Sequence, residues 1–152
     1  MDILGREELK RNPLFENLDS DEMQKIMGLS ERQTFDAGSL VFSQDEEARK
    51  LFLVEKGLVG AIVQLRPTLQ LTIATESRGG ILGWSALVPP HTYTASAKCF
   101  EQSQLLAFEG AKLREICYRE PHLGVKIFEG LARLIAVRLQ KTNLQVLDAM
   151  WK

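Results

Sequence analysis

The sequence has few cysteines and no long apolar run. Its two cysteines, Cys99 and Cys117, lack the CxxC spacing of zinc sites and do not suggest a disulfide framework. The N-terminal stretch MDILGREELKRNPLF mixes charges of both signs, so it predicts neither a signal peptide nor a membrane anchor. From these absences we expect a cytoplasmic protein without a membrane partner.

An excess of charge of one sign is missing as well. Nineteen Lys and Arg stand against twenty Asp and Glu, a net charge of −1, so no overall positive field favours nucleic acid. The two histidines, His91 and His122, show no metal-ligand spacing with the cysteines. No glycine-rich phosphate loop or supported Ser-His-Asp pattern occurs either. We therefore predict no enzymatic activity, no metal site and no direct nucleic-acid binding.

What the sequence does have is an ordinary globular composition arranged in three zones. Its 152 residues are 45% hydrophobic and 26% charged, which is typical of one domain with a real core. Residues 1–31 predict a helical lead-in, within which Asp19 and Glu22 have the spacing of a capping box. Residues 32–109 predict a β-domain, and residues 110–152 predict C-terminal helices.

The β-domain is predicted from alternating apolar and polar residues interrupted by turn residues. Segments such as RQTFDAGSLVF and KLFLVEKGLVGAIVQL contain two β-rich runs each, separated by a short break with glycine. With Thr92–Phe100 and Ser103–Phe108 as further strands, the zone holds at least seven short strands. This spacing favours an antiparallel barrel, roll or sandwich.

The last zone changes to a helical period. It predicts a short helix at Gly110–Arg119 and a long helix from Pro121 to about Met150. In the long helix a seam with a 3.5-residue period persists for about three heptads, the lower limit for a coiled coil. Two interpretations are open: parallel pairing with a second copy, or packing on the domain itself. The seam residues are Phe128, Ala132, Ile135, Leu139, Thr142, Val146 and Ala149.

Five segments are most informative when taken together: NPLFENLDSDEMQKI, FDAGSLVF, LFLVEKGLV, LGWSAL with the later TASA, and ARLIAVRLQKTN. Their order and spacing, from Asn12 to the C-terminus, resemble the cyclic-nucleotide-binding domain of the catabolite activator and fumarate-nitrate regulator superfamily. The resemblance implies a mainly β fold with flanking helices (α+β), an eight-stranded antiparallel β-roll of jelly-roll type. It also implies one sensor domain over residues 1–152, with a long C-terminal dimerisation helix and without the helix-turn-helix domain of related transcription factors.

The resemblance also locates a ligand cassette. In that family, backbone N–H groups near a Gly-Glu pair meet the cyclic phosphate, the glutamate accepts from the ribose hydroxyl, and an arginine neutralises the phosphate. The matching positions are Gly83 for the glycine, Trp84 for the glutamate and His91 for the arginine. An indole N–H cannot accept a hydrogen bond, and imidazole lacks the two-pronged contact of a guanidinium. Losing both contacts is expected to weaken cyclic-nucleotide binding by about two to four orders of magnitude.

Three interpretations of this cassette are open. Trp84 fills an emptied cavity, leaving a ligand-free dimerisation module. Alternatively an unidentified small molecule binds against the indole, or a cyclic nucleotide still binds at low affinity through His91 and the amides of residues 83–86. The candidate ligand-binding residues are Gly83, Trp84, Ser85, Ala86, His91, Thr92, Thr142 and Asn143. Thr142 and Asn143 are included because the resemblance places them where the long helix meets the purine and the partner subunit. The chain would be either a stand-alone sensor or the sensory fragment of a regulator. In both cases it would need an effector protein or domain to produce a response.

Overall fold

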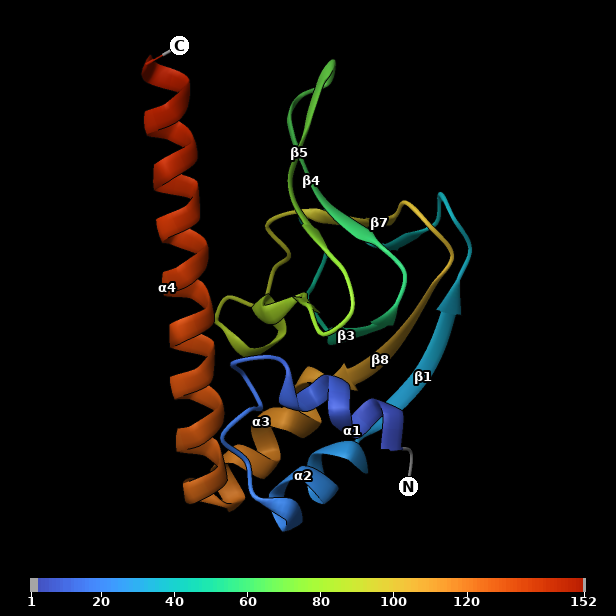
Figure 1. The fold of residues 1–152 in the computed structure, drawn as a ribbon, viewed down its shortest axis with the longest axis vertical. Helices are drawn as coiled ribbons and strands as arrows, with labels where there is room; N and C mark the ends of the chain where they lie inside the picture. Colours follow the sequence, from blue (N-terminus) through green and yellow to red (C-terminus); the bar gives the residue numbers. More distant parts are fainter. Residues whose placement is uncertain (1–2, 152) are drawn as a thin grey trace.

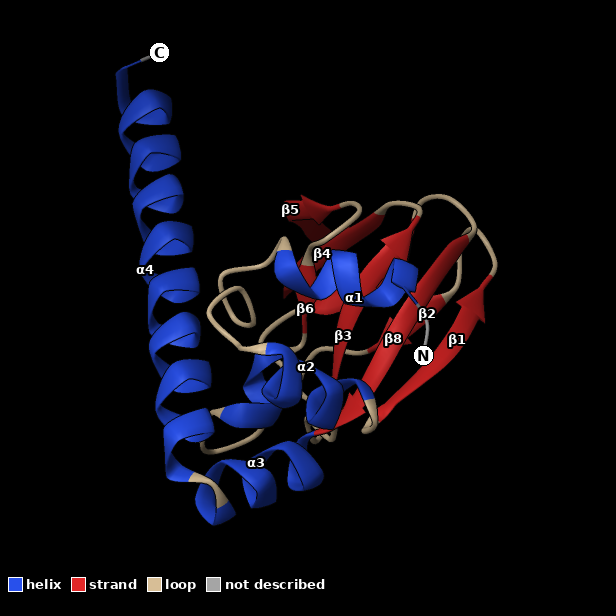
Figure 2. Cartoon of the chain, turned by 60° about the horizontal axis from the view of Figure 1, so that its bottom comes forward, coloured by secondary structure: helices blue, strands red, loops and turns tan. Residues whose placement is uncertain are grey.

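The computed structural model describes residues 3–151 of the chain (Figures 1 and 2). Helices α1 (Ile3–Lys10) and α2 (Ser20–Met27) precede the strands, and α3 (Gly110–Arg119) and α4 (Pro121–Trp151) follow them. A single-turn 3-10 helix, η1 (Trp84–Leu87), lies between β6 and β7. The strands are β1 (Ser30–Phe35), β2 (Leu40–Phe42), β3 (Lys50–Lys56), β4 (Val59–Arg66), β5 (Leu69–Glu76), β6 (Ile81–Leu82), β7 (Ser96–Cys99) and β8 (Ser103–Glu109).

The strands form two antiparallel four-stranded sheets that pack together as a β-roll. Their orders are β1-β8-β3-β6 and β2-β7-β4-β5. In β3, alternate side chains serve two cores, because successive residues of a strand point to opposite faces. Leu51 and Leu53 belong to the core shared with the helices, whereas Phe52 and Val54 belong to the core between the sheets. Because both faces of β3 are buried, its residues 51–54 are all apolar.

The helices cover the outer face of the first sheet (Figure 2). Phe15 of the lead-in packs against Phe108 of β8, with ring centroids 5.8 Å apart, and both side chains are fully buried. The first half of α4 lies against this lead-in at Gly130, where a Cβ atom would stand 2.4 Å from the Pro13 carbonyl oxygen. The glycine therefore permits a close approach of two backbones. No described helix is both long and apolar enough to cross a membrane.

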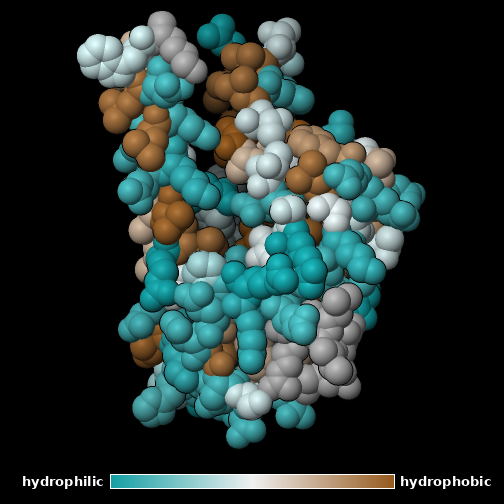
Figure 3. All heavy atoms as spheres, in the orientation of Figure 1, coloured by the Kyte–Doolittle hydropathy of each residue, from teal (hydrophilic) through white to brown (hydrophobic). Residues whose placement is uncertain are grey.

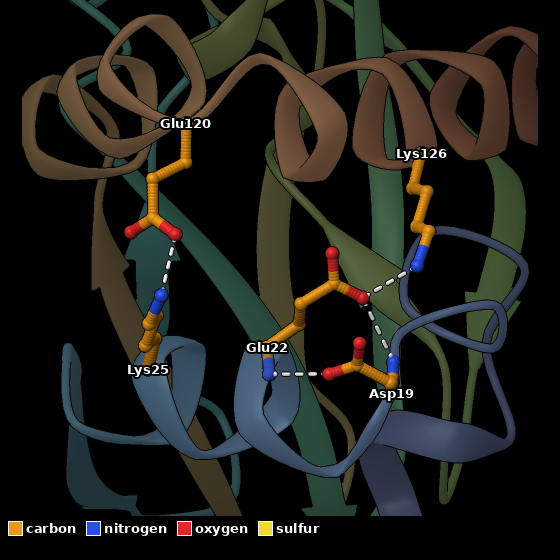
Figure 4. A network of polar contacts seen from close by, with 5 residues as sticks. All are labelled: Asp19, Glu22, Lys25, Glu120 and Lys126. Atoms are coloured by element: carbon orange, nitrogen blue, oxygen red, sulfur yellow. Dashed lines mark hydrogen bonds and ion pairs between the residues drawn. The ribbon is translucent and has the colours of Figure 1, made fainter.

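Charged contacts also attach α2 to the beginning of α4 (Figure 4). The backbone N–H of Glu22 donates to the Asp19 carboxylate at 2.8 Å, and the Asp19 N–H donates back to the Glu22 carboxylate at 2.9 Å. This confirms the capping box, and the Glu22 backbone N–H lowers the pKa of Asp19. Lys126 donates to the same Glu22 carboxylate at 2.6 Å, and Lys25 pairs with Glu120. The lead-in and the C-terminal helices thus form one layer.

The fold class and the predicted helices are confirmed. The short helix occupies Gly110–Arg119, and the long helix runs from Pro121 to Trp151. The strand predicted at Thr92–Phe100 is wrong in its first half, because β7 spans only Ser96–Cys99. Tyr93 instead exchanges backbone hydrogen bonds with Asp45 and Glu46 at 2.9 and 3.0 Å. Residues 91–93 therefore pair with the loop at residues 45–48, and the chain enters the sheet later than its composition suggests.

Candidate ligand-binding cavity

A cavity of about 230 Å³ lies between the β-roll and α4. The cassette contributes Gly83, Trp84 and Ser85 to its wall, and α4 contributes Arg138, Thr142 and Gln145. These three α4 residues share one helix face because they are four and three positions apart. Apolar side chains complete much of the lining, including Ala61, Ile73, Ile81 and Leu82. The cavity is therefore mostly apolar with a few polar groups, as small-molecule sites usually are.

The cassette turn begins at Gly83, whose backbone is left-handed with φ 78° and ψ 31°. A Cβ atom at this position would lie 2.9 Å from the Lys50 carbonyl oxygen of β3, so glycine meets both the conformation and the close approach. The N–H of Ala86 donates to the Gly83 carbonyl at 3.0 Å within the turn. That amide is already engaged and is not a donor for a ligand.

Trp84 lines the cavity and does not fill it. Its half-buried side chain packs against the core shared with the helices and lines the cavity. The guanidinium carbon of Arg138 lies 4.8 Å from the indole centroid, a cation–π contact between the cassette and α4. Trp84 and Arg138 thus form an aromatic wall with a cation over it.

Arg138 also forms an ion pair with the end of β5. Its Nη2 donates to the Glu76 carboxylate at 2.6 Å, and both side chains are about three-quarters buried, at 25% and 22% exposure. Burial raises the pKa of Glu76, although the charges of Arg138 and Lys141 oppose the rise. The contact connects the C-terminal half of α4 to the β-roll beside the cavity.

Phe42 and Tyr93 form the opposite aromatic part of the wall. Their rings are stacked, with centroids 3.8 Å apart and an interplanar angle of 11°. The Tyr93 hydroxyl donates to the Lys50 carbonyl at 2.6 Å and accepts from the Lys50 N–H at 3.2 Å. Burial raises the pKa of Tyr93, so this side chain is a neutral surface held in one orientation.

Comparisons with known proteins agree with this architecture. The family model described as the cyclic nucleotide-binding domain matches residues 32–120, more than half of the chain. The chain belongs to this family. Its match begins at β1 and ends after α3, so it contains the cassette and every strand that lines the cavity.

Solved and curated relatives support the same family. The N-terminal domain of a transcriptional regulator from Streptomyces coelicolor A3(2) superposes with a TM-score of 0.74 at 25% identity, covering 94% of each chain. The catabolite activator protein of Thermus thermophilus gives a TM-score of 0.76 at 27% identity, covering 91% of this chain and 63% of its own. Glutaminase 1 of Bradyrhizobium diazoefficiens is 32% identical over 142 residues, which are 91% of this chain and 22% of that protein. The chain thus spans less than two thirds of the latter two proteins.

The structure brings together four of the predicted site residues in this member of the family. Gly83, Trp84, Ser85 and Thr142 line the cavity, whereas the other four do not. Ala86 is fully buried against Gly110 of α3, Thr92 forms an isolated bridge with Glu47, and Asn143 is exposed beside Thr142 on α4.

His91 is placed outside the cavity by its backbone. With a left-handed φ of 59°, it directs Nδ1 to the Ser85 carbonyl oxygen at 3.0 Å. The segment lines the cavity from Tyr93, two residues later, through Ser96. The sequence did not identify Arg138 and Gln145 as cavity residues, although they lie one turn before and after Thr142. Which face of α4 lines the cavity depends on where the helix packs on the β-roll. The periodicity of α4 around Thr142 was the available signal.

The raised pKa of Glu76 predicts how the free energy of unfolding depends on pH. The folded chain holds the Glu76 proton more tightly than the unfolded chain, so its stabilising contribution is complete below the ordinary value of 4.5 and is lost as the pH rises through the folded-state pKa. Glu76→Gln has no such loss. We expect its free energy of unfolding, relative to the wild type, to increase from below pH 4.5 to neutral pH in urea titrations. A constant difference over this range would contradict the prediction.

Proposed function

We propose that the chain is a non-catalytic, ligand-sensing regulatory domain. One observation carries the proposal: a single cavity has one wall from the cassette and another from α4. A small molecule in this cavity would contact both elements at once, and its binding would favour one position of α4. Ligand binding can shift such an equilibrium only through contacts that differ between the two positions. The helix contacts of Arg138, Thr142 and Gln145 supply that difference.

The output of the sensor, in this proposal, is pairing of α4 with its counterpart in a second copy. Every residue from Leu139 to Trp151 is exposed in the single chain. The predicted seam is exposed at Leu139 and Val146, to 59% and 53%. Figure 3 shows apolar side chains on α4 and on the β4–β5 hairpin, with a hollow between them. A homodimer would cover the helix, and Thr142 belongs to both the seam and the cavity wall.

Tight binding of cyclic AMP or cyclic GMP is not part of the proposal. Trp84 offers no acceptor to a ribose hydroxyl, and no cation of the cassette lines the cavity. A cyclic nucleotide at low affinity remains compatible with the aromatic walls. The regulated process would be reached through an effector protein or domain.

Thermal-shift titration tests the sensing proposal. Cyclic AMP and cyclic GMP are expected to stabilise the domain only at millimolar concentration, and Thr142→Ala should abolish the shift because it removes a cavity-lining hydroxyl. Asn143→Ala is the matched control, since this neighbouring side chain does not line the cavity. A shift at micromolar nucleotide would contradict the low affinity. The absence of any ligand effect on stability or on sedimentation would favour the alternative, a ligand-free dimerisation module.

A further inference from the structure

The cation of the cavity comes from α4 and not from the cassette. Among the residues that line the cavity, Arg138 is the one with a positive charge. On the proposed sensing function, we infer that the ligand is a planar aromatic carboxylate: its ring would lie on the aromatic wall and its carboxylate would bind the guanidinium of Arg138. This differs from a nucleotide cassette in both the position of the cation and the kind of anion.

A carboxylate fits the guanidinium as it stands in the cavity. Arg138 already binds one carboxylate, that of Glu76, through Nη2. A guanidinium has five N–H donors in a planar fork, which matches a carboxylate in two-pronged contact. Two cations, Arg138 and Lys141, act on the single carboxylate of Glu76. In the proposed complex the ligand carboxylate would bind guanidinium N–H groups other than the one that donates to Glu76.

The remaining lining is mostly apolar, with the hydroxyls of Ser85, Thr94 and Ser96 as its polar groups. Trp84 and Tyr93 both line the cavity, and the Tyr93 hydroxyl is fully occupied by the Lys50 backbone. Planar rings stack favourably on such surfaces. Ile73, Ile81 and Leu82 add apolar contact, but a ribose hydroxyl would find no acceptor on the indole. Thr142 and Gln145 line the cavity from the same helix face as Arg138, so the carboxylate would point to α4.

Glu76 competes with the ligand for Arg138 in this arrangement. The two variants of the pair are therefore expected to have opposite effects. Arg138→Gln removes the charge-assisted contact and should weaken binding of an aromatic acid by about tenfold to a hundredfold. Glu76→Gln removes the competing carboxylate from the guanidinium and should strengthen binding of the aromatic acid. A gain of affinity cannot result from a folding defect, which keeps the proposal testable if Arg138→Gln folds poorly.

Calorimetric titration of the full chain with 1-naphthoate and indole-3-acetate tests the inference. Their neutral amides, 1-naphthamide and indole-3-acetamide, are the matched ligands without charge. We expect each acid to bind at least about tenfold more tightly than its amide, and the amides to be indifferent to both variants. Arg133→Gln is the protein control, because Arg133 lies on the same helix, pairs with Glu16 at 2.6 Å and does not line the cavity.

Three results would overturn the inference: amides that bind as tightly as acids, acids that bind Arg138→Gln unchanged, or no binding of either acid at millimolar concentration. Cyclic AMP serves as the second arm of the titration. If it binds and Arg138→Gln leaves its affinity unchanged, the carboxylate assignment fails while the proposed sensing function stands. If no titrated compound alters stability or pairing, the sensing function fails with it.

Discussion

A double substitution, Leu139→Asp with Val146→Asp, is expected to turn a homodimer into a monomer. Both side chains lie on the 3.5-residue seam of α4 and are more than half exposed in the single chain. In a parallel pair each would face its own copy, so the variant would bring two carboxylates together in an apolar contact. Because an unpaired buried charge costs several kcal/mol, we expect pairing to weaken by at least about a thousandfold.

Sedimentation equilibrium measures this change directly. Val137→Asp is the matched control, since Val137 is 42% exposed on the same helix but lies between the seam positions 135 and 139. The control should pair like the wild type. A wild-type chain that remains monomeric at high concentration would refute the pairing, and a double variant that remains dimeric would refute the seam.

Phe108→Ala is expected to lower the free energy of unfolding by about 3–5 kcal/mol. Phe108 has no exposed surface and lies in β8, where its ring packs against Phe15 of the helical lead-in. The substitution leaves a cavity where the sheet and the helices meet, and a backbone held by two neighbouring strands can collapse only partly around it.

Urea denaturation followed by circular dichroism gives the measurement. Tyr118→Ala provides the comparison, because Tyr118 is 80% exposed on α3 and its loss should cost within about 0.5 kcal/mol. A Phe108→Ala variant as stable as Tyr118→Ala would show that the sheet and the helices do not share one core.

Local signals accounted for much of the fold. The capping box at Asp19 and Glu22 has both of its hydrogen bonds, and the short helix begins and ends at the predicted residues. Each of these features depends on residues close together in the chain. The strand predicted from Thr92 was wrong because its structure depends on a distant segment. The loop at residues 45–46, which is not a neighbour in sequence, forms the backbone hydrogen bonds with Tyr93.

The candidate site was predictable only in part. The order of the segments predicted a cassette at Gly83 and Trp84, and the resemblance and the helix period drew attention to Thr142; these three residues line the cavity. The placement of His91 at the cavity did not follow, since the left-handed backbone at this residue turns the imidazole to the Ser85 carbonyl. Arg138 could be seen as a helix cation, but its partner Glu76 is 62 residues away in the chain.

The three zones and the bounds of the two C-terminal helices could be predicted from the residues alone, because period and caps are local properties. That Trp84 borders a cavity and that Arg138 lies over the Trp84 ring follows from the packing of distant segments. Both depend on where α4 crosses the β-roll, which the packing of Gly130 on the lead-in and the ion pair of Arg138 with Glu76 define between segments far apart in the chain.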